Sequence, residues 1–322
     1  MSEPPMTEPY VRPDVRVFLD LLKDAPRPKM TAETLPMMRP MAPKGMAMLE
    51  PPVGELAATR DLSAPGPAGD IPLRLFDVRA EREPGPVVVF CHGGGFVIGN
   101  IDTHVSMCAE LSRLLDLPVV SVDYRLAPEH PFPAAPDDAE AAARWIAANG
   151  AAFGRTVTGL VLCGDSAGGA LVIVTALALR DRPAAVPVLL QVPLYPAVDR
   201  GGAYPSGEAF GLGFGLDTTD MAFYDQAYSP DRSDWRGSPI IADLSGLPPL
   251  LLVTAGLDPL RDQGRAYAAK AVQAGVRTTY VEVPGVIHGF LGFRRAIPSA
   301  AQDFVEVMAI ARAMLEQSLA AG

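Results

Sequence analysis

Basic residues are scarce in this sequence, and their scarcity limits the partners that the protein can bind. The 322 residues include 27 lysines and arginines against 37 aspartates and glutamates, which gives a net charge of −10. The sequence has no cluster of basic residues of the kind that follows a phosphate backbone. This charge balance excludes nucleic acid and anionic lipid as electrostatic partners.

Cysteines and long apolar runs are also rare. The three cysteines (Cys91, Cys108 and Cys163) are an odd number without metal-type spacing. We therefore expect buried thiols, no disulfide framework and a cytoplasmic location. The N-terminal sequence lacks the basic and apolar blocks of a secretion signal. The longest apolar stretch, residues 170–179, is too short to cross a bilayer, so we expect no membrane span.

A regular alternation of two kinds of segment begins at about residue 70. Short apolar runs typical of buried strands occur at 71–78, 86–91, 118–124, 159–163, 187–194, 248–256 and 278–283. Helix-like segments separate several of them, at 104–115, 136–148, 167–181, 262–274 and 300–318. The alternation predicts an α/β fold, with a mostly parallel central sheet that is flanked by helices on both faces.

Two segments depart from this alternation. Residues 1–50 contain one short amphipathic stretch, 15–25, followed by a region rich in Met and Pro, where proline should prevent a long regular helix. Residues 199–237 contain glycines and aromatic residues but no strand of the buried type. We expect these segments to form a two-piece cap over an apolar site. The catalytic domain would then comprise residues 51–198 and 238–322. A loosely packed arm is the alternative for the first segment.

The sequence GDSAG places a single serine, Ser166, between a predicted strand and a predicted helix. This context is typical of a nucleophile elbow, which presents the hydroxyl at the carboxyl edge of the sheet. The serine needs a carboxylate and a histidine, which in this architecture follow it in that order. His288 is the only one of four histidines after Ser166, and Asp258 ends the preceding strand. The sequence thus predicts a Ser166, Asp258 and His288 triad, with Asp262 expected to open the next helix instead.

A glycine-rich loop, HGGGF at 92–96, follows the strand predicted at 86–91. Consecutive glycines allow backbone amides to point inward, so we expect Gly94 and Gly95 to form an oxyanion hole with the amide of Ala167. His92 would anchor this loop rather than act as a base. The loop has neither the lysine of a P-loop nor the spacing of a dinucleotide fingerprint, which disfavours phosphate binding.

Blocks spread along the chain together resemble the hormone-sensitive-lipase-like branch of the α/β-hydrolases. They are HGGGF at 92–96, YRLAPEHPFPAAPDD at 124–138, GDSAGG at 164–169, DPLRD at 258–262 and HGF at 288–290. The resemblance runs from about residue 70 to the end. It implies an α/β-hydrolase fold with a helical two-piece cap and a serine carboxylesterase active on short- to medium-chain acyl esters, without metal or organic cofactor. The chain departs from many relatives at Ala170, where they often have Asn.

The substrate and the assembly are less closely specified. We expect substrate size to be set by Phe96, by the Met-rich arm and by the aromatic residues of the second cap segment. These are Phe210, Phe214, Phe223, Tyr224 and Tyr228. Ordinary packing within the cap is the alternative for each. The same triad could act on an amide, a lactone or a polyester. A non-catalytic receptor, as on this fold in plants, is disfavoured by the complete triad. A second copy could pair at the last strand and helix, residues 278–318, as a homodimer.

Overall fold

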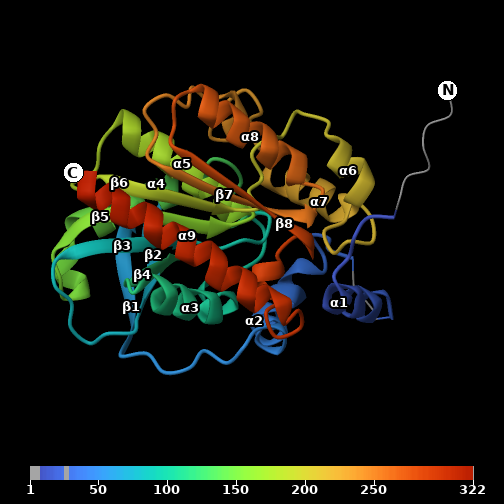
Figure 1. Ribbon diagram of the computed structural model, residues 1–322, viewed down its shortest axis with the longest axis horizontal. Helices are drawn as coiled ribbons and strands as arrows, with labels where there is room; N and C mark the ends of the chain where they lie inside the picture. Colours follow the sequence, from blue (N-terminus) through green and yellow to red (C-terminus); the bar gives the residue numbers. More distant parts are fainter. Residues whose placement is uncertain (1–7, 25–28, 322) are drawn as a thin grey trace.

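An eight-stranded sheet runs through the middle of the protein in the computed structural model (Figure 1), which describes residues 8–24 and 29–321. Along the sheet the strands lie in the order β1-β2-β4-β3-β5-β6-β7-β8. β2 pairs antiparallel with β1 and β4, and the remaining pairs are parallel. The strands are β1 (Ala58–Gly66), β2 (Gly69–Asp77), β3 (Gly85–Cys91), β4 (Val119–Val122), β5 (Val157–Asp165), β6 (Val188–Leu194), β7 (Leu250–Leu257) and β8 (Thr278–Ile287).

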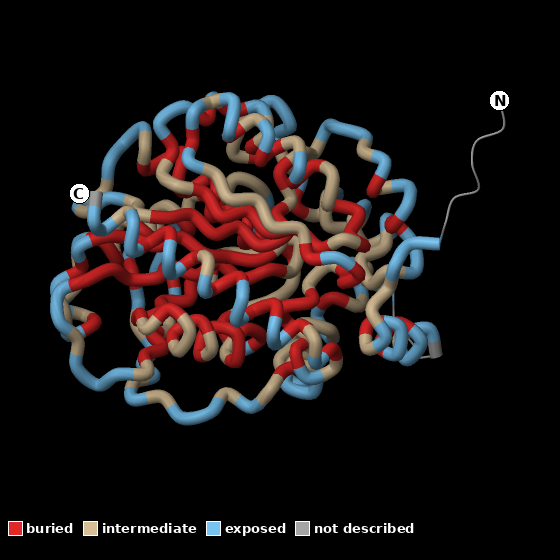
Figure 2. Tube along the Cα trace, in the orientation of Figure 1, coloured by how far each residue is buried: buried red, intermediate tan, exposed pale blue. Residues whose placement is uncertain are grey.

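Helices cover both faces of the sheet and enclose two cores. The strands alternate between them: Val87 and Val89 of β3 belong to one core, and Val88 and Phe90 belong to the other. The first core includes residues of α4 (Ala134–Ala148), α5 (Ala167–Asp181) and α8 (Arg261–Gln273). The second includes residues of α3 (Val105–Leu115) and α9 (Ser299–Ala321). Figure 2 shows the sheet as the most continuously buried part of the chain. The predicted fold class is confirmed.

The remaining helices are short or lie in the two predicted cap segments. They are α1 (Pro13–Asp24), α2 (Leu35–Leu49), α6 (Pro205–Phe210), α7 (Thr218–Tyr228), and the 3-10 helices η1 (Ile101–Thr103), η2 (Gly150–Phe153), η3 (Pro239–Ile241) and η4 (Phe290–Gly292). In Figure 1, α1, α2, α6 and α7 all lie at the same end of the sheet. Residues 1–7 and 25–28 of the first cap segment lie outside the described residues.

The expectation that proline prevents a long regular helix in the Met-rich arm was wrong. α2 has 15 residues and contains Pro40 and Pro43. A proline inside a helix costs about 3 kcal/mol, because a backbone hydrogen bond is lost and the ring crowds the preceding turn. Tertiary contacts offset this cost: Arg39 donates to the carbonyl oxygens of Val97 at 2.8 Å and Ala127 at 2.6 Å. Packing on the sheet domain overrides local propensity here.

Strand β1 was missed in the sequence, because its residues do not form an apolar run. It lies at the edge of the sheet and pairs with β2 alone, and most of its side chains are exposed or half-buried. Two or three charged and polar residues in a row are tolerated there, whereas they would not be in a central strand. The seven other strands of the sheet were predicted, and their bounds agree with the structure to within a few residues.

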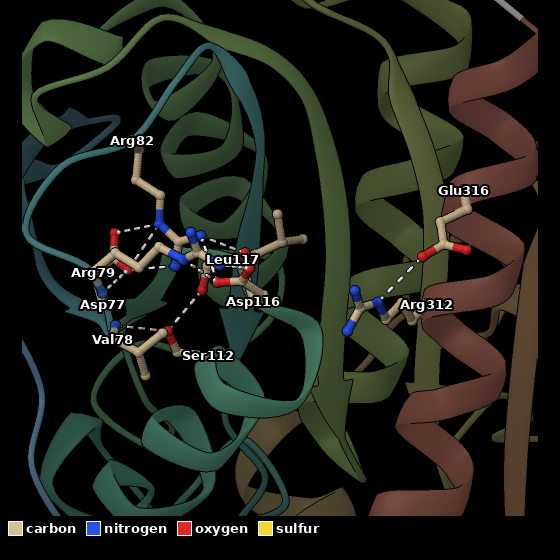
Figure 3. Close-up of polar contacts among 9 residues, drawn as sticks. All are labelled: Asp77, Val78, Arg79, Arg82, Ser112, Asp116, Leu117, Arg312 and Glu316. Atoms are coloured by element: carbon tan, nitrogen blue, oxygen red, sulfur yellow. Dashed lines mark hydrogen bonds and ion pairs between the residues drawn. The ribbon is translucent and has the colours of Figure 1, made fainter.

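A polar network far from the carboxyl edge fixes the connection from β2 to β3 (Figure 3). Arg82 pairs with Asp77 at 2.6 Å and with Asp116 at 2.9 Å, and the Arg82 and Asp77 side chains are only 9% and 7% exposed. The pair of Arg312 and Glu316 in the same figure joins two exposed side chains of α9 at 3.2 Å. The first network holds a loop to the end of α3, whereas an exposed pair of the second kind contributes little to stability.

The helices of the described residues are all too short or too polar to cross a lipid bilayer. All three cysteines are buried and carry free thiols, as the sequence predicted.

Candidate active site

Ser166 lies at a sharp turn between β5 and α5. Its backbone has φ 53° and ψ −115°, a region that non-glycine residues rarely adopt. Hydrogen bonds on both sides hold this conformation: the Ser166 amide donates to the Leu194 carbonyl at 2.8 Å, and the Ala170 amide donates to the Ser166 carbonyl at 3.1 Å. The turn therefore depends on the packed sheet and helix around it.

The two glycines of GDSAG are required because another strand passes close to the turn. A Cβ atom on Gly164 would lie 2.6 Å from the carbonyl oxygen of Cys91, and one on Gly168 would lie 1.9 Å from the same oxygen. Real Cβ atoms do not approach backbone that closely. The spacing of the motif thus lets the end of β3 lie against the start of α5, which brings the glycine-rich loop beside Ser166.

The imidazole of His288 lies between Ser166 and Asp258. Its Nε2 atom is 2.8 Å from Ser166 Oγ, and its Nδ1 atom is 2.7 Å from Asp258 Oδ2. Asp258 follows β7 directly and is fully buried, and its other oxygen accepts a hydrogen bond from the Leu260 amide at 2.8 Å. His288 follows β8 directly. The structure brings together the three residues that the sequence singled out.

Asp262, the alternative carboxylate, does not face His288. It lies in the first turn of α8, where it accepts a hydrogen bond from the Ser206 amide at 2.9 Å and pairs with Arg261 at 2.8 Å. Burial alone would raise the pKa of Asp262, but the hydrogen bond and charge of Arg261 hold it below its usual value. Asp262 therefore joins α6 to α8.

The glycine-rich loop adopts a conformation that only glycine tolerates well. Gly94 has φ +119° and Gly95 has φ +63°. A Cβ on Gly94 would lie 2.1 Å from the Ile98 carbonyl oxygen, and one on Gly95 would lie 2.4 Å from the ring of Tyr224. Among the described residues, neither amide donates a hydrogen bond to another protein group. The Ala167 amide, in the first turn of α5, lacks an acceptor within the helix.

His92 is fully buried beneath this loop. Its Nδ1 atom donates to the Gly93 carbonyl at 2.8 Å, and its own carbonyl accepts a hydrogen bond from the Tyr124 hydroxyl at 2.7 Å. Burial, helped by the neighbouring His104, lowers the pKa of His92 to about 3. A neutral, enclosed imidazole holds the loop in position but cannot exchange protons with a substrate.

Asp165 links the elbow to the glycine-rich loop, a role that the sequence did not reveal. One of its oxygens accepts a hydrogen bond from the Gly93 amide at 2.8 Å and lies 3.3 Å from Nε2 of His104. Burial alone would raise the pKa of Asp165, but the charge and hydrogen bond of His104 lower it. The only hint in the sequence is that Asp165 occupies the first variable position of the G-x-S-x-G motif, next to Ser166. Nothing in the sequence pairs it with His104.

Two cavities meet at Ser166. The first has a volume of about 320 Å³ and the second about 350 Å³, and both are lined by Gly95, Leu216 and Tyr224 as well as Ser166. Further residues of the first cavity are Ala167, Asp199, Arg200, Tyr204, Met221, Asp225 and Gln263. Further residues of the second are Ala42, Met46, Leu49, Gly94, His104, His288 and Phe293. Residues of both predicted cap segments thus line the second cavity.

The aromatic residues that were expected to contact substrate have different positions. Tyr224 lines both cavities. Phe96 is 3% exposed and stacks on Tyr228, with 3.9 Å between ring centroids. Phe210 is 7% exposed and meets Phe214 edge to face at 5.2 Å. These three phenylalanines do not line either cavity, and neither do Phe223 and Tyr228.

The residues that line the cavities instead include several that the sequence gave no reason to single out. Arg200 and Leu216 belong to the second cap segment, and Phe293 follows η4. The Met-rich arm was predicted only as a whole, and the structure identifies Met46 as its methionine at the cavity. Within the described ranges, no cluster of three or more His, Cys, Asp and Glu residues could hold a metal ion.

Comparison with known proteins gives a consistent result. A family model described as alpha/beta hydrolase fold matches residues 88–292. The carboxylic ester hydrolase LipN of Mycobacterium tuberculosis is 40% identical over 275 residues, which cover 80% of this chain and 70% of that protein. The ethyl acetate hydrolase of Pseudomonas putida is 33% identical, with 92% of this chain and 97% of that protein covered.

Solved structures agree with the sequence relatives. The ester-hydrolase EH1AB1 from the metagenome of Lake Arreo superposes with a TM-score of 0.88 at 39% identity, covering 95% of this chain and 99% of that one. The hyperthermophilic esterase of Pyrobaculum calidifontis gives 0.86 at 38% identity, covering 95% and 99%. The chain therefore belongs to the hormone-sensitive-lipase-like family of α/β-hydrolases and is a carboxylic ester hydrolase.

Proposed function

We propose that this protein hydrolyses short- to medium-chain acyl esters in two steps, through an acyl group bound to Ser166. The observation that carries the proposal is the position of the His288 imidazole, within hydrogen-bond distance of Ser166 Oγ at 2.8 Å and of Asp258 Oδ2 at 2.7 Å. A serine, a base and an orienting carboxylate in this geometry form the arrangement that acyl transfer requires.

In the first step Ser166 Oγ attacks the ester carbonyl carbon, and its proton passes to Nε2 of His288. The buried Asp258 stays ionised, and it holds the ring and stabilises the imidazolium. Negative charge develops on the carbonyl oxygen, and the free amides of Gly94, Gly95 and Ala167 would stabilise it. Each such donor contributes about 3 kcal/mol to transition-state stabilisation. The imidazolium then protonates the departing alkoxide, which leaves as the alcohol.

In the second step a water molecule attacks the acyl group on Ser166. His288 Nε2 removes a proton from the water and then returns it to Ser166 Oγ, so that the carboxylic acid is released and the enzyme is restored. Every proton that moves passes through one nitrogen atom. The reaction therefore depends on Asp258, which fixes that nitrogen as the one facing the serine.

The cavities support esters of modest size. Volumes of about 320 and 350 Å³ are at the lower end of the range for small-molecule sites. Their apolar residues, Leu216 and Met221 in one and Met46 and Leu49 in the other, suit alkyl groups. The similarity to an ethyl acetate hydrolase also favours short chains.

The test is hydrolysis of p-nitrophenyl esters from acetate to palmitate by the wild type, Ser166→Ala and Ser63→Ala. Ser63 is an exposed residue of β1 and serves as the matched control. We expect fast turnover of short chains that declines towards palmitate, a loss of about 10⁶-fold in kcat for Ser166→Ala, and no change for Ser63→Ala. Undiminished turnover in Ser166→Ala would contradict the proposal. Turnover of amides, lactones or polyesters but not of simple esters would correct the bond that is cleaved.

Assembly and location form a separate part of the proposal. We propose a homodimer formed at β8 and α9, because β8 is an edge strand that pairs with β7 on one side only. Light scattering in solution tests this, and a monomer at micromolar concentration would contradict it. We propose a cytoplasmic location, which the three free thiols support. Fractionation of the source cells tests the location.

A further inference from the structure

The first cavity is lined by Arg200, a half-buried arginine whose side chain makes no hydrogen bond to any described residue. The side chain of Arg200 is 14% exposed, and none of its three guanidinium nitrogens donates a hydrogen bond to a described residue. The nearest carboxylate oxygen, on Asp225, is 3.7 Å from Nη1, which is too long for a hydrogen bond. The other oxygen of Asp225 is bound by Arg232 at 2.6 Å. A guanidinium that is largely enclosed and makes no hydrogen bond lacks much of the stabilisation that water would give it.

Two other enclosed arginines of the protein are paired closely with carboxylates, whereas Arg155 has two enclosed nitrogens without a hydrogen bond. Arg294 is 3% exposed and pairs with Glu50 at 2.8 Å, and Arg82 is 9% exposed and pairs with Asp77 at 2.6 Å. Neither of them lines the cavities at Ser166. Arg200 differs from Arg294 and Arg82 because its side-chain donors are unused in a cavity that Ser166 also lines.

Arg200 is nevertheless held in place. Its guanidinium carbon lies 5.4 Å from the ring centroid of Phe96 and 5.9 Å from that of Tyr228, and its amide donates to Ser238 Oγ at 3.2 Å. Aromatic rings interact with the face of a guanidinium and leave the N–H groups in its plane free. Its Nε atom is completely enclosed, so the terminal nitrogens are the ones that can reach a molecule in the cavity.

The position of His288 indicates which part of an ester enters this cavity, provided that the proposed function holds. His288 lines the second cavity but not the first, whereas Ala167 lines the first but not the second. The imidazolium must protonate the leaving oxygen, so the alcohol group lies on the His288 side. The acyl chain then extends into the first cavity, towards Arg200.

The charge around Arg200 favours a neutral partner over an anionic one. Asp199 and Asp225 line the same cavity. Asp199 accepts hydrogen bonds from the Gly201 and Gly202 amides at 2.8 and 3.0 Å and from the Tyr204 hydroxyl, which favours its ionised form. A carboxylate on the substrate would be repelled by both aspartates, whereas a carbonyl or hydroxyl oxygen would not.

We infer that Arg200 is a specificity-determining residue that donates a hydrogen bond to a neutral oxygen on the acyl chain of the substrate. The preferred substrates are then esters of oxo-, hydroxy- or ester-bearing carboxylic acids rather than of plain alkanoic acids. The apolar walls of the cavity contact the carbon chain of the acyl group, and Arg200 favours acyl chains that carry an additional oxygen.

The experiment compares matched pairs of p-nitrophenyl esters in which a methyl branch replaces the oxygen: 4-oxopentanoate with 4-methylpentanoate, and 5-oxohexanoate with 5-methylhexanoate. The readout is the ratio of kcat/KM within each pair, which does not depend on the fraction of folded enzyme. We expect the wild type to prefer one oxo ester by about tenfold or more, as for a hydrogen bond to a charged donor. Arg200→Met should lower that ratio to about one, and Arg200→Lys should give an intermediate ratio.

Arg182→Met is the control variant, because Arg182 lies beyond the C-terminal end of α5 and its side chain is 76% exposed. Its ratio should equal that of the wild type. Ratios near one in the wild type for both pairs, or an unchanged ratio in Arg200→Met, would overturn the inference while leaving ester hydrolysis intact. A preference for the p-nitrophenyl monoester of succinate over the oxo esters would also overturn it. Failure to hydrolyse any of these esters would overturn the proposed function as well.

Discussion

The carboxyl edge of the sheet and the two predicted cap segments, residues 1–50 and 199–237, differ in how their described residues reach the site. Ser166, Asp258 and His288 each follow the last residue of a strand, so the backbone alone carries them to one point. In the predicted cap segments, the position of a residue along the chain does not determine whether its side chain lines a cavity. Tyr224 lines the cavities, whereas Phe210 and Phe214 pack against each other. Chemistry is thus specified by topology, and substrate selection by side-chain packing.

The largest effect expected after that of Ser166→Ala tests the carboxyl edge of the sheet. Asp258→Asn should lower kcat on p-nitrophenyl acetate by about 10⁴-fold, because the imidazole would adopt the wrong tautomer while its position is kept. Asp262→Asn is the control, since that carboxylate binds the Ser206 amide and Arg261 rather than His288. It should change kcat by less than about tenfold. A larger loss in Asp262→Asn than in Asp258→Asn would reverse the assignment of the two carboxylates.

The next effect concerns the glycine-rich loop. Gly94→Ala should lower kcat by roughly 10²- to 10³-fold, as the loss of an oxyanion donor does. The reason is steric: the added Cβ would lie 2.1 Å from the Ile98 carbonyl oxygen at φ +119°, so the loop must move. Gly275→Ala also places a side chain at positive φ, but in open space just beyond the C-terminal end of α8, and controls for backbone strain alone. Normal kcat in a folded Gly94→Ala would exclude this amide as a donor.

A smaller effect is expected for Asp165, which joins the elbow to that loop. Asp165→Asn should lower kcat by about tenfold, since a charged acceptor for the Gly93 amide becomes a neutral one. It should also lower the free energy of unfolding at pH 7 by about 1–3 kcal/mol. Since the folded protein lowers the pKa of Asp165, its stabilisation is present above the unfolded pKa of about 3.9 and is lost as the pH falls through the folded value.

Urea denaturation at pH 7 and at pH 3 measures this difference. The gap between the wild type and Asp165→Asn should be full at pH 7 and reduced at pH 3. A gap that widens on acidification would show that the ionised Asp165 does not stabilise the fold.

The smallest effect is expected in the first predicted cap segment. Met46→Ala removes one flexible, half-buried side chain from the second cavity, on the side assigned to the alcohol. It should change kcat/KM by about two- to threefold and leave the acyl-chain profile unaltered. Comparison of ethyl and benzyl acetate measures the alcohol side, and the p-nitrophenyl series measures the acyl side. A shifted acyl optimum in this variant would exchange the roles of the two cavities.

The sequence could predict what depends on strand ends and on motif spacing. The order of serine, carboxylate and histidine selected three residues from the whole chain, and the structure brings these three within hydrogen-bond distance. Steric exclusion at Gly164 and Gly168 explains why so short a motif carries that much information. The alternation of apolar runs was sufficient for the sheet, apart from the exposed edge strand β1.

What could not be predicted depends on contacts between distant segments. The helix α2 contains two prolines and is held by Arg39, which donates hydrogen bonds to the carbonyl oxygens of Val97 and Ala127. The link between Asp165 and His104 joins residues 61 positions apart in the sequence. The unused donors of Arg200 become apparent only when every neighbouring oxygen has been placed. Secondary-structure propensities and the periodicity of apolar residues do not encode such contacts between distant segments.

The most direct test of the central claim is covalent labelling with a p-nitrophenyl alkylphosphonate, followed by peptide mass spectrometry. Attack by Ser166 Oγ on phosphorus forms an O–P bond and releases p-nitrophenolate, which also reports the rate. We predict one adduct, on the peptide that contains Ser166, with stoichiometric release in the wild type, much slower labelling in His288→Gln and none in Ser166→Ala. An adduct on any other residue, or equal labelling of Ser166→Ala, would contradict the account.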